Sequence, residues 1–244
     1  MLKWIRYILL GIIFILVGTF GSLFCLFRPF QPQNTPLFAN IISYLGLKVL
    51  NLKVTYKNWE KRIPIKPSIV ICNHQSILDV FLCGAVIHGR TVSVGKKAIK
   101  YIPFFGQLYW LAGNIIIERE SPKKAMVIMD RATRKAVIED NMSIWIFPEG
   151  TRNPEPILLP FKRGAFRTAI KAQVPILSIC VSTYKGQVDL NRWHSGHIMI
   201  DILDTVFTEG LKSSDSAGLT AKCQNQIQNH IDIMNTELSK SMFN

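Results

Sequence analysis

The sequence predicts an α/β fold, in which a mixed central sheet is flanked by helices and follows an N-terminal hydrophobic helical membrane anchor. From residue 52, short apolar runs alternate with helical patterns over about 150 residues, and this alternation is typical of a layered α/β domain. Some runs, such as residues 144–147 (Ile-Trp-Ile-Phe), are continuously apolar, which indicates strands buried on both faces. The stretch from Tyr7 to Phe27 carries no formal charge.

This uncharged stretch is long enough, at about 1.5 Å per residue, to cover the hydrocarbon core of a bilayer. A cleaved secretory signal is the alternative, but the run is too long for a signal and no small-residue cleavage site follows it. After three prolines, apolar residues recur at helical spacing over residues 37–50, which favours a partly inserted or in-plane helix. A soluble core helix is the alternative there. We expect residues 1–51 to form the anchor and residues 52–244 the α/β domain.

Within the domain, the apolar runs and amphipathic stretches predict individual elements in order. The predicted strands are residues 52–56, 68–72, 91–94, 114–117, 143–147, 176–182 and 197–203. The predicted helices are residues 77–87, 121–138 and 219–238.

The charged residues, cysteines and histidines of the chain indicate which partners and sites to expect. The 244 residues include 29 Lys and Arg against 16 Asp and Glu, a formal net charge of +13, which favours anionic partners such as nucleic acid, acidic lipid or phosphorylated substrates. Five cysteines without a C-x-x-C pair argue against a disulfide scaffold and a zinc site, so we expect reduced, buried thiols. The histidines at 88, 194, 197 and 230 have no acidic or Cys partner at ligand spacing, and we interpret them as structural.

The first segment with chemical potential is residues 73–79 (Asn-His-Gln-Ser-Ile-Leu-Asp), which follows a buried strand and opens a helix. Asp79 lies about one turn into that helix, within reach of the His74 imidazole. A carboxylate on one ring nitrogen fixes the tautomer and leaves the other nitrogen as a base. Because the chain has no G-x-S-x-G motif, the hydroxyl would come from the substrate and attack an activated acyl group such as a thioester. The alternative is a helix-capping His beside a solvated Asp.

Three further segments supply polar or basic groups. Residues 147–152 (Phe-Pro-Glu-Gly-Thr-Arg) place a glycine, which lets backbone amides approach a ligand, before Arg152, whose planar guanidinium suits phosphate oxygens. Glu149 is interpreted as a structural partner of an Arg or a backbone N–H. Residues 113–119 would bring Arg119 to the same rim, and Lys96 begins a basic and aromatic segment suited to a membrane surface or an acyl groove. For residues 147–152, the alternative is an ordinary strand-end turn with a surface Arg. For residues 113–119, the alternative is an exposed ion pair of Glu118.

Four segments in this order resemble the phosphate-acylglycerol acyltransferase family. Residues 73–79 match its N-H-x-x-x-x-D motif, residues 113–119 resemble its second motif, and residues 147–152 match F-P-E-G-T-R. Residues 174–176 (Val-Pro-Ile) resemble the start of the fourth motif, although Leu177 and Ser178 stand where a second proline is usual. The resemblance covers roughly residues 5–200.

The resemblance implies an enzyme of phospholipid biosynthesis. It would transfer a fatty acyl group from acyl-CoA or acyl-carrier protein to the sn-2 hydroxyl of lysophosphatidic acid, giving phosphatidic acid. His74 would be the general base and Asp79 its orienting partner. The residues implied to bind the substrate phosphate are Lys96, Arg119, Glu149, Gly150, Thr151 and Arg152. No metal, no tightly bound cofactor and no nucleic-acid partner are implied.

The expected orientation of the chain in the membrane follows from the charges near the apolar stretch and from the acyl donors, which are cytosolic in the family that the sequence resembles. A single span with Lys3 and Arg6 inside would leave the domain outside the cell. We therefore expect both N-terminal helices to enter one leaflet of the cytoplasmic membrane, with the domain on the cytosolic face. Anionic lipid would attract it by about 1 kcal/mol per well-placed basic residue.

Two rival functions remain at this stage. Within the family, the acceptor could be glycerol-3-phosphate or another lysophospholipid. Outside it, a non-catalytic membrane protein that binds anionic lipid or nucleic acid would explain the charge and the apolar start. That rival would leave His74 and Asp79 beside the Arg152 loop unexplained.

Overall fold

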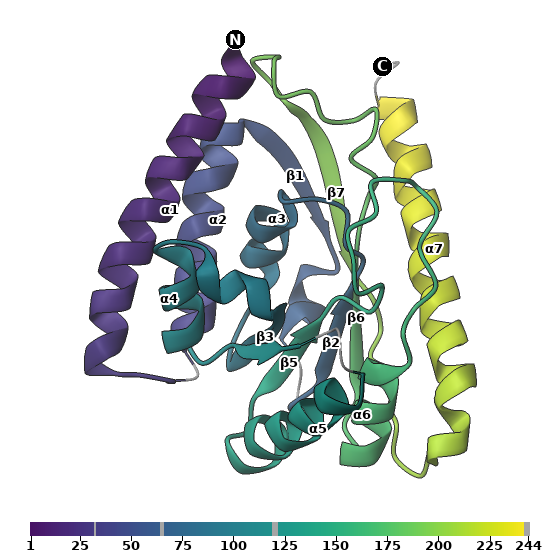
Figure 1. Ribbon diagram of the computed structural model, residues 1–244. Coiled ribbons are helices and arrows are strands. Elements are labelled where there is room, and N and C mark those ends of the chain that lie inside the picture. The colour runs from purple at the N-terminus through teal and green to yellow at the C-terminus, as the bar shows by residue number, and fades with distance from the viewer. Residues whose placement is uncertain (32, 64–65, 119–121, 242–244) are drawn as a thin grey trace. The chain divides into compact units, whose positions relative to one another are not determined.

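The computed structural model describes residues 1–31, 33–63, 66–118 and 122–241 (Figure 1). By packing, the chain divides into two compact units, one of residues 1–49 with 80–145 and one of residues 50–79 with 146–244. The functional boundary expected after residue 51 stays a prediction.

The first unit contains the N-terminal helices and a small parallel sheet. Its helices are α1 (Leu2–Phe27), α2 (Asn34–Leu50), α3 (Asp79–Val86), α4 (Phe105–Leu111) and α5 (Pro122–Thr133), and its strands are β3 (Thr91–Lys96), β4 (Ile115–Ile117) and β5 (Ser143–Ile146). The last residue of α2, Leu50, the first residue of α3, Asp79, and the last residue of β5, Ile146, belong to the second unit. The strands pair in the order β5, β3, β4, and both pairings are parallel.

Helix α1 is the one helix among the described residues that is long and apolar enough to cross a membrane, judged by length and composition. Large apolar side chains such as Trp4, Phe20 and Leu26 are exposed on it. Its opposite side is packed, because Cys25 forms a buried cluster with Phe38 of α2 and Leu108 of α4. The helix therefore has a face fixed to its own unit and an apolar face without protein cover.

The second unit is a mixed four-stranded sheet in the order β1, β7, β6, β2. Strand β1 runs parallel to β7 and β2 parallel to β6, whereas β6 and β7 are antiparallel. Helix α7, the long yellow helix in Figure 1, packs against β6 and β7. The elements are β1 (Leu52–Lys57), β2 (Ile69–Cys72), α6 (Gly164–Ala172), β6 (Ile176–Val181), β7 (Gly196–Ile202) and α7 (Ser216–Ser241).

This topology places several chain segments at one edge of the second unit's sheet. Because β6 and β7 are antiparallel, β2 and β6 end at the edge where β1 and β7 begin. Residues 73–79 follow β2 and residues 182–195 follow β6, so both segments lie at this edge. Strands β2 and β6 are buried along their whole length, as their continuous apolar runs predict.

The predicted fold class is confirmed, and each of the seven predicted strands is present with small shifts at its ends. Two helices, α4 and α6, were not predicted, because both are short. The predicted helix at 121–138 is α-helical to Thr133 and continues as a π-helix over Arg134–Glu139. All five cysteines are buried thiols outside any disulfide, as expected.

Candidate active site

His74 lies just after β2, at the edge where β2 and β6 end. Its Nδ1 atom lies 2.5 Å from Oδ2 of Asp79, the first residue of α3. The Asp79 side chain is 1% exposed and that of His74 is 17% exposed. The pairing expected from the sequence spacing is therefore present, and the imidazole keeps access to solvent.

Three further donors hold the Asp79 carboxylate. Oδ2 accepts hydrogen bonds from the backbone N–H groups of Gln75 at 2.7 Å and Ser76 at 3.0 Å. Oδ1 accepts a hydrogen bond from the Tyr184 hydroxyl at 2.5 Å. With both oxygens engaged, the carboxylate has a fixed orientation toward the imidazole. The hydrogen-bond network assigns the proton of neutral His74 to Nδ1, which leaves the lone pair of Nε2 to accept a proton.

Two buried amide side chains bring Tyr184 to this position. Asn73 bonds both backbone groups of Val181, donating to its carbonyl at 2.9 Å and accepting from its N–H at 2.8 Å. Gln75 donates to the carbonyl of Ser182 at 2.9 Å and accepts from the N–H of Tyr184 at 3.0 Å. The turn after β2 and the chain after β6 are therefore bound as one piece. No sequence spacing links Tyr184 to Asp79, and our sequence analysis missed it.

The segment after β5 holds the other side of His74. The Phe147 ring stacks on the imidazole, with centroids 4.0 Å apart and planes 18° apart. Glu149, which is buried, accepts the N–H of His74 at 2.7 Å through Oε1 and the N–H of Leu159 at 3.2 Å through Oε2. The N–H of Asn153 donates to the His74 carbonyl at 2.7 Å. Glu149 as a partner of backbone N–H is confirmed, whereas its place in the phosphate-binding set stays a prediction.

The turn at Gly150 carries basic side chains. Gly150 has φ +74°, and a Cβ there would lie 2.7 Å from Nζ of Lys162, so the backbone passes close to this amine. Thr151, Arg152 and Lys162 are exposed. Lys162 belongs to a basic cluster that the sequence shows directly after the Arg152 loop, but the sequence analysis did not assign it to the site. The turn offers glycine backbone, a hydroxyl and two cations, a combination suited to a phosphate group.

The two remaining predicted residues lie elsewhere in the chain. Lys96 is the exposed last residue of β3 in the first unit. Arg119 lies outside the described residues. The expected roles of both residues stay predictions.

One histidine has an acidic partner that the sequence analysis did not foresee. His230 of α7 places Nδ1 2.8 Å from Oδ2 of Asp201, which is 29 residues away in the chain and therefore outside any ligand spacing in the sequence. Oδ1 of Asp201 accepts from Asn58 at 2.7 Å, and Cys180 lies beside the pair. Burial, followed by the Asp201 charge, holds the pKa of the Cys180 thiol well above its ordinary value. Because protein donors occupy both Asp201 oxygens, we assign the cluster a structural role between β6, β7 and α7.

Comparison with known proteins agrees with this geometry. A family model described as Acyltransferase matches residues 53–182. The chain is 38% identical over 240 residues to the 1-acyl-sn-glycerol-3-phosphate acyltransferase of Haemophilus influenzae, covering 98% of this chain and 99% of that protein. It is 36% identical over 244 residues to the enzyme of that name from Escherichia coli, with coverage of 98% and 97%.

A solved structure is similar in fold. The crystal structure of the 1-acyl-sn-glycerophosphate acyltransferase from Thermotoga maritima superposes with a TM-score of 0.74, covering 96% of this chain and 95% of that one at 19% identity. At this identity the likeness establishes the fold alone.

Glu149→Gln tests the link between the two segments around His74. Burial raises the pKa of the Glu149 carboxyl, while the hydrogen bonds from His74 and Leu159 lower it. The glutamine amide keeps one oxygen acceptor, but its NH2 group faces the other backbone N–H, which loses its hydrogen bond. Because a buried donor is then left without an acceptor, we expect the free energy of unfolding to fall by about 1–3 kcal/mol. Denaturant unfolding in detergent micelles measures this. Glu155→Gln, at an exposed ion pair with Lys185, is the matched control and should change it by less than about 1 kcal/mol. Equal losses in the two variants would contradict the assignment.

Proposed function

The chain belongs to the acyltransferase family, and from this premise we propose that it transfers a fatty acyl group to the sn-2 hydroxyl of 1-acyl-sn-glycerol 3-phosphate, giving phosphatidic acid. The donor is acyl-CoA or acyl-carrier protein, and the reaction is a step of phospholipid biosynthesis. The observation that carries the proposal is the His74–Asp79 pair, whose carboxylate is held by Tyr184. The names of the bacterial relatives support this acceptor.

The proposed chemistry needs no protein nucleophile. Nε2 of His74 takes the proton of the acceptor hydroxyl as its oxygen attacks the thioester carbonyl carbon. The tetrahedral intermediate collapses with cleavage of the C–S bond, and the departing thiolate takes the proton back from the imidazolium. Asp79 stabilises the imidazolium that exists between these steps, as an orienting carboxylate does in other His–Asp pairs. The products are the ester and the free thiol, and His74 returns to its starting state.

Binding of the acceptor is assigned to the turn after Phe147. Arg152 supplies a guanidinium for two phosphate oxygens, and Gly150 with Thr151 supplies close backbone and a hydroxyl. Lys96 and Arg119 are proposed as helpers, and Glu149 acts in this set by holding the His74 backbone. No metal or tightly bound cofactor enters the proposed reaction. The acceptor and the acyl donor are the proposed partners, together with membrane lipid.

A membrane location suits this substrate, because lysophosphatidic acid is an amphiphile. We place the protein on the cytosolic face of the cytoplasmic membrane, with α1 and α2 entering one leaflet. The uncovered apolar face of α1 supports the insertion, and the net charge of +13 favours anionic lipid.

An acceptor panel tests the reaction. Purified protein in mixed micelles receives one acyl-CoA with lysophosphatidic acid, glycerol-3-phosphate or lysophosphatidylcholine, and acyl-carrier protein replaces CoA in a parallel series. We expect turnover of lysophosphatidic acid, and we expect His74→Ala to lose about two to four orders of magnitude in kcat because the general base is gone. His88→Ala, at an exposed histidine, is the matched control and should retain activity. Turnover of another acceptor alone would move the protein within its family, and full activity of His74→Ala would refute the mechanism.

Arg152→Ala tests whether this side chain binds the phosphate of the acceptor. Loss of a charge-assisted contact to phosphate at this exposed turn should raise KM for lysophosphatidic acid about 5- to 30-fold. We expect KM for the acyl donor to stay the same, as measured by steady-state kinetics. Arg167→Ala removes an exposed arginine from α6 and should leave both constants unchanged. An effect of Arg152→Ala on the donor alone would place the acceptor phosphate elsewhere.

Labelling from outside the cell tests the orientation. Cysteines introduced as Lys3→Cys and Lys240→Cys should both resist a membrane-impermeant maleimide in intact cells, because both ends lie on the cytosolic side. Both should react once the cells are permeabilised. Reaction of one end only in intact cells would show that α1 spans the bilayer.

A further inference from the structure

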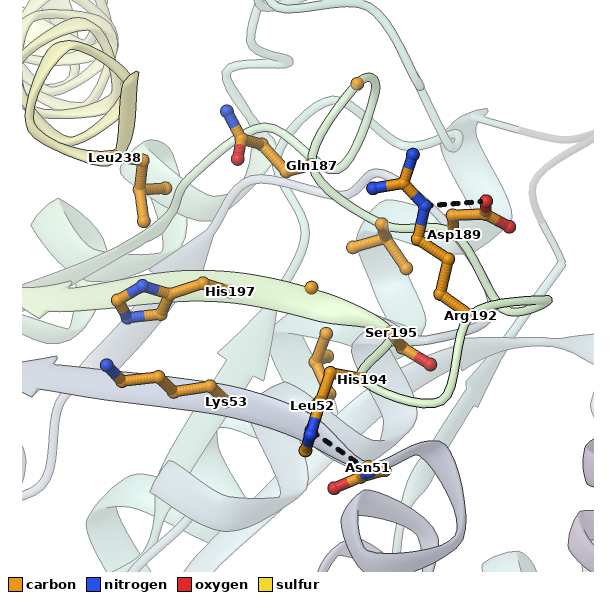
Figure 2. A pocket seen from close by; sticks show the side chains of 13 residues that line it. Asn51, Leu52, Lys53, Gln187, Asp189, Arg192, His194, Ser195, His197 and Leu238 are labelled. Atoms are coloured by element: carbon orange, nitrogen blue, oxygen red, sulfur yellow. Dashed lines mark hydrogen bonds and ion pairs between the residues drawn. The ribbon is translucent and has the colours of Figure 1, made fainter. Parts of the chain in front are cut away.

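A second polar recess lies at the same sheet edge as His74. It is a cavity of about 570 Å³ in the second unit, where β1 and β7 begin (Figure 2). Its walls come from the start of both strands, from the loop at residues 186–195 and from Leu238 of α7. None of its lining residues belongs to the machinery assigned above.

The polar lining consists mainly of hydrogen-bond donors and basic groups. Lys53 and His197 occupy neighbouring positions on the parallel strands β1 and β7, and their side chains lie side by side in Figure 2. Arg192 and His194 come from the loop. Among the described residues that line the cavity, Asp189 is the one carboxylate, and it pairs with Arg192 at 3.4 Å in an exposed contact.

Burial, and after it the positive charge of Lys53, lowers the pKa of the His197 imidazole. One ring nitrogen lies 2.8 Å from the Thr55 hydroxyl. An anion placed between Lys53 and His197 would offset this charge, whereas a cation would meet repulsion.

The cavity wall is held by close backbone packing and by hydrogen bonds within the chain. A Cβ at Gly196, where φ is +137°, would lie 1.9 Å from the carbonyl oxygen of Gln187, so only glycine allows the loop to approach β7 this closely. The Ser195 hydroxyl donates to the Leu50 carbonyl at 2.5 Å, and the N–H of Asp189 donates to the Ser195 carbonyl at 2.8 Å. A preformed recess of this kind loses little conformational entropy when a ligand binds.

The same loop connects the cavity to the His74 site. The carbonyl of Tyr184 accepts the N–H groups of Gln187 and Val188, each at 3.0 Å, and both of these residues line the cavity. The Tyr184 hydroxyl holds Asp79. One short loop therefore connects the cavity wall directly to the partner of the catalytic pair.

We propose that this cavity binds phosphate groups, and that its ligand is the phosphate-bearing part of the acyl donor. The proposal rests on the proposed function, in which the turn at Gly150–Arg152 takes the acceptor's phosphate and the donor's phosphates have no assigned site. A donor whose thioester reaches His74 extends its phosphates away from that atom, and the cavity lies at the same edge. Anionic phospholipid headgroups carry the same chemistry and are the second source that the test must separate.

The test combines direct binding with kinetics on the full chain. Lys53→Ala and Arg192→Ala, singly and together, are compared with Lys222→Ala, an exposed lysine of α7 outside the cavity lining. Calorimetric titration with CoA in neutral detergent measures donor binding, and co-sedimentation with vesicles containing phosphatidylglycerol measures lipid binding. We expect the double variant to weaken CoA binding and raise KM for acyl-CoA about tenfold or more. KM for lysophosphatidic acid and the thermal midpoint should not change.

The possible results of these experiments lead to different conclusions about the ligand of the cavity. Loss of vesicle binding with CoA binding unchanged would keep the phosphate site but assign it to lipid. Unchanged binding of both CoA and vesicles in the double variant would overturn the proposal. If the wild-type chain transferred no acyl group from any donor while the double variant still lost CoA binding, the cavity would stand and the proposed function would fail.

Discussion

The buried carboxylate of Asp79 is the constraint on which the rest of the site depends. A charge with 1% of its side chain exposed is costly unless protein donors replace water around it. Four donors do so, from His74, two successive backbone amides and the Tyr184 hydroxyl. These bonds stabilise the turn after β2 and fix the imidazole at the same time. Orientation of the proposed base is thus a consequence of satisfying a buried charge.

The mixed sheet explains how residues far apart in sequence reach this carboxylate. Strands β2 and β6 are parallel neighbours, so the turn at His74 and the chain leading to Tyr184 leave the sheet together. Asn73 and Gln75 then bond the two segments through their amide groups. Glu149 adds a third segment by accepting the His74 N–H. His74 is held by its backbone, its ring face and its Nδ1 atom, which leaves Nε2 for the proposed proton transfer.

The sequence patterns predicted the contacts and elements that form between residues close together in the chain. The His74–Asp79 pair lies within one strand-to-helix turn, and the buried strands have continuous apolar sequences, so both were predictable. Tyr184 was not, because its contact with Asp79 joins residues 105 apart and depends on strand order. The Asp201–His230 pair was missed for the same reason. Helix α6 was missed because it has only nine residues and directly follows the basic pair Lys162 and Arg163.

The tautomer of neutral His74 shows whether Asp79 orients the imidazole as a base. Nitrogen-15 NMR of histidine-labelled protein in micelles, with His74→Gln to assign the signal, reports which ring nitrogen carries the proton at neutral imidazole. We expect Nδ1–H with an unprotonated Nε2, and a change toward the Nε2–H form in Asp79→Asn. An Nε2–H tautomer in the wild-type chain would rule out His74 as a base acting through Nε2, because that nitrogen would already carry a proton.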